Sequence, residues 1–140
     1  MHWMLKPLRR YADFSGRSQR MEYWMFVLFA VLTMVAAFLV VAIFVGIGDP
    51  YGKKDATWDG VLVLGILGSI YLAIYLPWLA VQVRRFHDQD LSGWFVLIGY
   101  IPYVGWLVIL IFMCMDGTHG ANRFGPDPKG GADFHADVFR

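Results

Sequence analysis

The sequence predicts an all-α membrane protein with about three transmembrane helices, and two observations lead to this fold class. The chain of 140 residues is 58% hydrophobic, whereas soluble domains average roughly 45–50%. Its charged residues are confined to four short blocks, which leave three charge-free runs at Tyr23–Gly48, Gly60–Val83 and Leu91–Met115. Each run exceeds the stretch of about 20 apolar residues that a helix needs to cross a bilayer. We therefore expect spans at about 23–48, 60–83 and 91–115.

The block ahead of the first run, residues 1–22, is basic and aromatic. Four apolar or aromatic residues recur in it at helical spacing, with basic residues largely between them: Trp3, Met4, Leu8 and Tyr11. This pattern is typical of a short basic helix lying in the membrane interface. The alternative is a frayed tail whose charges only anchor the first span. No cleavable signal peptide is expected, because the first run is too long for one and follows this charged block.

The second run carries three small residues, each four positions apart: Gly65, Ser69 and Ala73. Small residues at this spacing let two membrane helices approach closely. We expect this face to pack against another helix, and within the chain rather than between chains. The alternative is that glycine and alanine are simply common in membrane helices.

The middle of the third run is unusual, because Pro102 lies between Gly99 and Gly105 among three amphipathic aromatic residues. Either the span is kinked, or the segment turns back as a re-entrant loop. The two arms of such a loop are too short to cross a bilayer, and re-entrant backbone requires burial in protein. A kinked single crossing is therefore the prediction.

Charge bias predicts which side of the membrane each segment occupies. The first block holds five Lys or Arg residues, and the loop between the second and third runs adds Arg84 and Arg85. By the positive-inside rule the N-terminus and this loop are cytoplasmic. Three crossings then place the turn-rich tail outside. We expect a single membrane domain over residues 1–128 and a flexible tail over 129–140.

The densest polar group beside a predicted span is formed by Arg84, Arg85, His87 and Asp88. It is a candidate membrane-proximal interaction site for an anionic head group, a phosphate or a partner's carboxylate, with Asp88 orienting His87. The alternative is an anchor that holds the loop in the cytoplasm by charge alone. An anchor does not explain the adjoining histidine and aspartate.

A second candidate constellation lies in the tail, where Asn122, Arg123 and Asp127 stand among glycine and proline residues. These residue types are those that tight turns require, so a structural motif is the main interpretation. In it, Arg123 pairs with Asp127 and holds the tail to the membrane surface.

Other chemistries find little support. The four histidines are too scattered for a metal site, so no metal is expected. No nucleotide-binding glycine pattern occurs, and we expect no cofactor. Cys114 lies in an apolar run without a basic neighbour, which is typical of an inert thiol. The net charge of +1 gives no indication of nucleic-acid binding. The absence of charge from all three runs argues against an ion pathway.

Several motifs together resemble those of the domain-of-unknown-function 805 (DUF805) family of small bacterial inner-membrane proteins. They are Phe14-x-Gly16-Arg17-x-x-Arg20-x-Glu22-Tyr23-Trp24, Pro77, Arg84-Arg85-Phe86-His87-Asp88, Ser92-Gly93-Trp94, Pro102-x-x-Gly105 and Asn122-Arg123-Phe124-Gly125-x-Asp127-Pro128. The resemblance covers roughly residues 3–128, with Phe86 where the family more often has leucine. It implies a bacterial plasma membrane and no particular activity.

The sequence leaves three functions open. The first is a non-enzymatic membrane component that packs with further copies of itself or with other membrane proteins. The second is a subunit of a small oligomeric transporter or channel. The third is a membrane-embedded enzyme acting on lipid head groups, with His87 and Asp88 as its acid–base pair. We expect the first, with the bilayer itself as a partner.

Overall fold

A computed structural model describes residues 2–48 and 56–130, and this part of the chain is helical. The elements in order are α1 (His2–Arg9), α2 (Arg20–Gly48), α3 (Ala56–Asp88), the 3-10 helix η1 (Gly93–Tyr100) and α4 (Gly105–Cys114). The described residues form no strand, although an isolated β-bridge joins Asn122 to Gly125. The all-α class predicted from the sequence is therefore confirmed.

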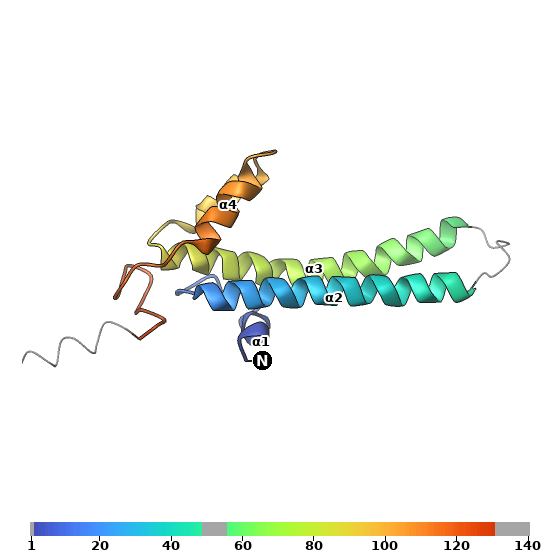
Figure 1. The fold of residues 1–140 in the computed structure, drawn as a ribbon, viewed down its shortest axis with the longest axis horizontal. Coiled ribbons are helices and arrows are strands. Elements are labelled where there is room, and N and C mark those ends of the chain that lie inside the picture. The colour runs from blue at the N-terminus through green and yellow to red at the C-terminus, as the bar shows by residue number, and fades with distance from the viewer. Residues whose placement is uncertain (1, 49–55, 131–140) are drawn as a thin grey trace, which may run out of the picture.

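Helices α2 and α3 form a long antiparallel pair (Figure 1). They are rich in Val, Ile, Leu and Phe, which form helices in lipid because every backbone group must be satisfied there without water. Among the described residues, these two helices are the ones long and apolar enough to cross a membrane. Only 6% of the most apolar stretch of each is buried inside the chain. Most of their apolar surface is thus free to meet lipid.

The third apolar run does not form the single crossing helix that the sequence predicted. Element η1 ends at Tyr100, and after a short turn α4 runs back along it (Figure 1). The rings of Phe95 and Phe112, near the two ends of the run, lie 6.3 Å apart. Residues 93–114 therefore form a helical hairpin, called the hairpin below. This is the chain reversal of the re-entrant alternative, and its place in the membrane stays a prediction.

Proline and glycine explain why the run reverses. Pro102 has no backbone N–H to donate and interrupts the helix, and Tyr103 then adopts a left-handed conformation with a φ of 65°. Gly105 begins α4 so close to η1 that a Cβ there would overlap the carbonyl oxygen of Ile98. Only glycine allows the two backbones to approach in this way.

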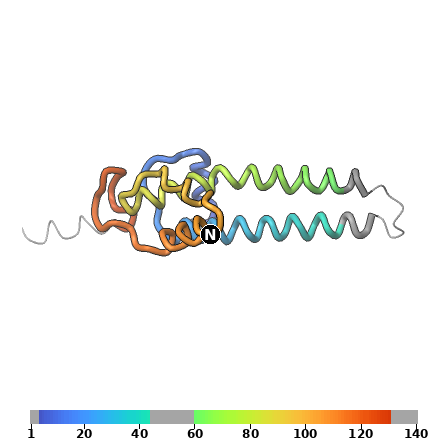
Figure 2. Tube along the Cα trace, turned by 90° about the horizontal axis from the view of Figure 1, so that it is seen from above, coloured from blue at the N-terminus to red at the C-terminus, as the bar shows by residue number. Residues whose placement is uncertain are grey.

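The hairpin returns the chain to the end at which it started. Figure 2 shows the N-terminal segment, the hairpin and the tail gathered at one end of the α2–α3 pair. The tail also contacts the segment before α2, where the Arg17 side chain donates to the carbonyl of Thr118 at 2.6 Å. The prediction of a tail on the opposite side from the N-terminus is therefore wrong. The predicted flexible tail lies mostly in residues 131–140, outside the described part.

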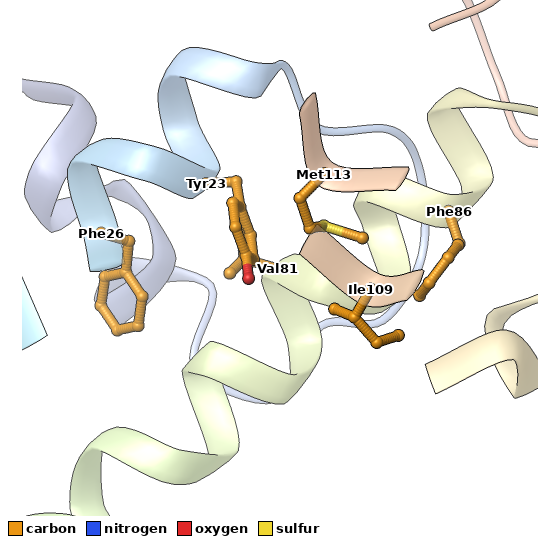
Figure 3. Packing of buried hydrophobic residues seen from close by; sticks show 6 residues of the cluster. All are labelled: Tyr23, Phe26, Val81, Phe86, Ile109 and Met113. Carbon is orange, nitrogen blue, oxygen red and sulfur yellow. The ribbon is translucent and has the colours of Figure 1, made fainter. Parts of the chain in front are cut away.

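The hydrophobic core lies at this same end. Figure 3 shows its six buried side chains, which come from α2, α3 and α4: Tyr23, Phe26, Val81, Phe86, Ile109 and Met113. Leu8 of α1 and Phe95 of η1 pack against the cluster. A short helix does form in the N-terminal block, as the sequence predicted, and it packs on α2. Its position at the membrane interface stays a prediction.

Candidate functional site

The polar end of α3 brings five ionisable side chains together, and all five are buried: Arg17, Glu22, Arg84, Arg85 and Asp88. We call this group the membrane-proximal cluster. Its members come from the segment before α2, the first turn of α2 and the last turns of α3. The sequence indicated the three α3 residues as part of a candidate site, whereas it did not place Arg17 or Glu22 in that site.

The Asp88 carboxylate links two arginines at the centre of the cluster. Arg17 Nε donates to Asp88 Oδ1 at 3.0 Å, and Arg85 Nη1 donates to Asp88 Oδ2. The three side chains are at most 4% exposed. Charges so buried need partners, because desolvation costs several kcal/mol per ion. The arrangement is therefore a three-residue link between the N-terminal segment and α3.

The same arginines fasten the tail. The Arg17 guanidinium donates to the carbonyl oxygens of Thr118 and Gly120, and Arg85 donates to that of Met115. In return, the Thr118 N–H donates to the Asp88 carbonyl at 2.8 Å. Charge-assisted hydrogen bonds of this kind are about twice as strong as neutral ones. The tail backbone is thus held by the buried cluster itself.

Glu22 extends the cluster to α1. Its carboxylate lies 2.7 Å from Lys6 Nζ and 3.5 Å from Arg84 Nη2. The Arg84 side chain is fully buried and makes no hydrogen bond, so the ion pair with Glu22 balances its charge. The Arg84 carbonyl accepts the Ser18 N–H at 3.1 Å. These contacts join α1, α2 and α3.

His87 lies apart from Asp88, contrary to the sequence interpretation. Its Nδ1 is 3.3 Å from the carbonyl oxygen of Gly16. Its ring stacks on Phe124 with centroids 3.9 Å apart, and its own carbonyl accepts a hydrogen bond from Asn122. Asp88, bound by two arginines, does not orient this imidazole. The expected histidine–aspartate acid–base pair is not assembled.

The three tail residues have separate roles in the structure. Arg123 pairs with Asp90, at 3.1 Å, rather than with Asp127. Asn122 closes a turn by accepting the Phe124 N–H and also reaches the His87 carbonyl. Asp127 accepts the N–H groups of Lys129 and Gly120, and these hydrogen bonds, chiefly that from Lys129, hold the pKa of its carboxyl below the usual value.

The small-residue face of α3 makes no close packing contact inside the chain. Gly65, Ser69 and Ala73 are all exposed, and a Cβ added at Gly65 would meet nothing within 4 Å. The preference for a contact within the chain is thus wrong for the described residues. Larger side chains on another face, including Ile74 and Trp78, pack against the core cluster instead.

A groove of about 440 Å³ lies between α3 and the hairpin, and Tyr23 and Trp24 of α2 complete its lining. Seven of its thirteen lining residues are aromatic and none is charged. The hydroxyls of Tyr75 and Tyr100 hydrogen-bond across it, joining α3 to η1. Gln82 also lines it; this side chain is 1% exposed, and its Oε1 has no hydrogen-bond partner.

Sequence reasoning missed the groove, although a signal for it exists. Four of its lining residues recur at helical spacing along α3: Tyr71, Tyr75, Trp78 and Gln82. Such spacing places them on one helix face. The other wall comes from the hairpin, and its position depends on a chain reversal that the sequence analysis did not favour.

Comparison with known proteins places these features in a family. Residues 11–126 match the family profile described as "Protein of unknown function (DUF805)". Inner membrane protein YhaH of Escherichia coli (strain K12) is 45% identical over 130 residues, covering 92% of this chain and 98% of that protein. Inner membrane protein YhaI of the same organism is 42% identical over 135 residues, covering 95% and 100%. No solved structure matches the chain significantly.

Proposed function

This chain belongs to the DUF805 family, and we propose that it is a multi-pass inner-membrane protein that binds a lipid-soluble molecule and performs no catalysis. Its relatives YhaH and YhaI are both named inner membrane proteins. Helices α2 and α3 have the length and composition of membrane spans.

The groove between α3 and the hairpin is the observation that carries the proposal. Most small-molecule sites are largely apolar and aromatic, with a few polar groups that orient the ligand. The groove has this composition, and it is lined mainly by α3 and the hairpin, which carry exposed apolar or aromatic side chains such as Tyr71 and Trp106. A molecule dissolved in the bilayer reaches it without crossing water.

The membrane-proximal cluster supports binding over catalysis by the way its groups are used. An acid–base pair must lie within hydrogen-bond reach of its partner and its substrate. Here the Asp88 carboxylate is occupied by Arg17 and Arg85, and His87 is stacked on Phe124. The cluster therefore has a structural role. His87 and Asp88 are not arranged as the acid–base pair that an enzyme acting on lipid head groups would need.

The hairpin fits a position in one leaflet of the bilayer. The ten residues of α4 extend about 15 Å at 1.5 Å per residue, and a hydrocarbon core is about 30 Å thick. The turn at its tip is apolar, and Tyr103 there is 93% exposed. We infer two full crossings by α2 and α3, with the hairpin entering the membrane to half its depth from the end that carries the cluster.

Charge bias then makes that end cytoplasmic. Nine of the twelve Lys and Arg residues belong to the segments gathered there, whereas Lys53 and Lys54 belong to the connection between α2 and α3. The positive-inside rule favours the side with the excess of Lys and Arg. The N-terminus, the cluster and the tail are therefore on the cytoplasmic side in this proposal.

Photocrosslinking tests the binding function. A benzophenone amino acid replaces Leu110, which lines the groove, or Leu64, which is exposed on α3 outside it. After irradiation in native membranes, intact mass spectrometry of the purified protein reports what was captured. We expect one dominant lipid adduct at position 110 and a mixture of bulk phospholipids at position 64. The same mixture at both positions would contradict a binding groove.

A further inference from the structure

We propose that the groove binds an uncharged lipid whose head group is a flat ring carrying oxygen atoms, which is the chemistry of a quinone. This inference rests on the proposed function and names the class of molecule that the site takes. Three properties of the lining lead to it: the absence of charge, the unpaired polar groups and the aromatic surface.

The lining excludes a charged head group. None of the thirteen lining residues is Lys, Arg, His, Asp or Glu. Nearby Arg84 and Arg85 are buried in ion pairs with Glu22 and Asp88. A phosphate placed in the groove would lose its hydration without gaining a counter-charge, which is prohibitively costly. A phospholipid can therefore offer the groove only its acyl chains.

Polar groups in the lining call for a ligand that also has polar atoms. The Gln82 amide oxygen is buried beside the groove without a partner, whereas buried polar groups in folded proteins are nearly always hydrogen-bonded. Turning the amide toward the groove would let a ligand supply that partner. The hydroxyls of Tyr75 and Tyr100 share one hydrogen bond. Whichever hydroxyl donates, the other keeps a hydrogen atom for a ligand. An acyl chain satisfies none of these groups.

The aromatic surface favours a ring. Side chains from both walls, including Tyr71 and Trp78 on α3 and Trp106 on α4, present indole and phenol groups to the same space. Aromatic rings attract other rings in stacked or edge-to-face arrangements beyond the area they bury. A ring with oxygen atoms at its edge can stack on these side chains and hydrogen-bond to the polar groups at the same time. Quinones and quinols have this form, and an amide offers both a donor and an acceptor for the two redox states.

A neighbouring cavity provides room for an isoprenoid tail. A second apolar cavity of about 370 Å³ lies along α2 and α3, and it shares Tyr71, Tyr75 and Trp78 with the groove. Its other walls include Val27, Ala30 and Met34 of α2. The ring would lie between α3 and the hairpin, with the tail following the helix pair into the bilayer.

Lipid analysis of the full chain tests this assignment. The protein is extracted from bacterial membranes directly into polymer-bounded lipid discs, purified, and analysed for quinone and phospholipid per mole of protein. Gln82→Leu removes the buried amide. Tyr100→Phe removes a groove hydroxyl together with its hydrogen bond to Tyr75, and Tyr103→Phe is its matched control at the exposed turn. Losing one such hydrogen bond should lower bound quinone by about 3- to 10-fold.

We expect quinone to be enriched in wild-type discs over the bulk membrane, and to fall in Gln82→Leu and Tyr100→Phe but not in Tyr103→Phe. If another lipid is enriched and responds to the same two variants, the quinone assignment is wrong while the binding function stands. If no lipid is enriched over the bulk membrane, both proposals fail.

Discussion

Replacing Asp88 by asparagine is expected to lower the free energy of unfolding by about 3–5 kcal/mol, the cost of breaking a buried ion pair from one side. Asparagine keeps the shape of the side chain but removes the charge that balances Arg17 and Arg85. The asparagine side chain also has only one acceptor oxygen. Its NH₂ group would face one of the two guanidinium groups, which can only donate hydrogen bonds. Thermal unfolding of the purified protein in mild detergent measures the effect.

Asp90 supplies the matched control, because it is two residues away and also pairs with an arginine. Asp90 and Arg123 are 47% and 59% exposed, so Asp90→Asn should cost less than about 1 kcal/mol. Equal losses of unfolding free energy in the two variants would show that the buried ion pairs of Asp88 do not hold the N-terminal segment and the tail to α3.

Replacing Gly117 by valine is expected to detach the tail and to destabilise the protein by about 2–3 kcal/mol, in the range of overpacked sites. A Cβ at this position would overlap the Asp88 carboxylate. The carboxylate cannot move away while Arg17 and Arg85 hold it, so the tail must move instead. Limited trypsin digestion at Arg123 and Lys129 should become faster.

Ala121→Val is the control for this variant, since Ala121 is exposed in the same tail. Its rate of digestion should match that of the wild-type protein. A Gly117→Val protein that resists trypsin as well as the wild type would mean that the tail does not lie against Asp88.

The two candidate membrane-spanning helices could be predicted from sequence because their signal is local. The lengths of charge-free runs such as Tyr23–Gly48 and Gly60–Val83 can be compared directly with the number of residues that a helix needs to cross a bilayer. The third run, Leu91–Met115, has the same length and composition, so hydropathy alone cannot separate a crossing from a hairpin. The deciding contact is the approach of Gly105 to Ile98, which depends on the packing of the reversed chain.

The candidate site was predicted in part, and helix geometry explains the rest. Adjacent residues on a helix do not face each other, so His87 and Asp88 point to different neighbours. Arg85 and Asp88, three residues apart, do meet. The proposed Arg123–Asp127 pair has helical spacing, but that segment forms turns, and Arg123 reaches Asp90 instead. Arg17 lies 71 positions from Asp88, and no local pattern reveals that contact.

Cysteine labelling of intact cells tests most directly whether the chain turns back within the membrane. In a Cys114→Ala background, single cysteines replace Tyr11 near α1, Lys129 in the tail, or Lys54 in the connection between α2 and α3. We expect a membrane-impermeant maleimide to label position 54 from outside, and to label positions 11 and 129 only after the cells are opened. Labelling of position 129 together with position 54 would show that the third run crosses the membrane, and would contradict the hairpin.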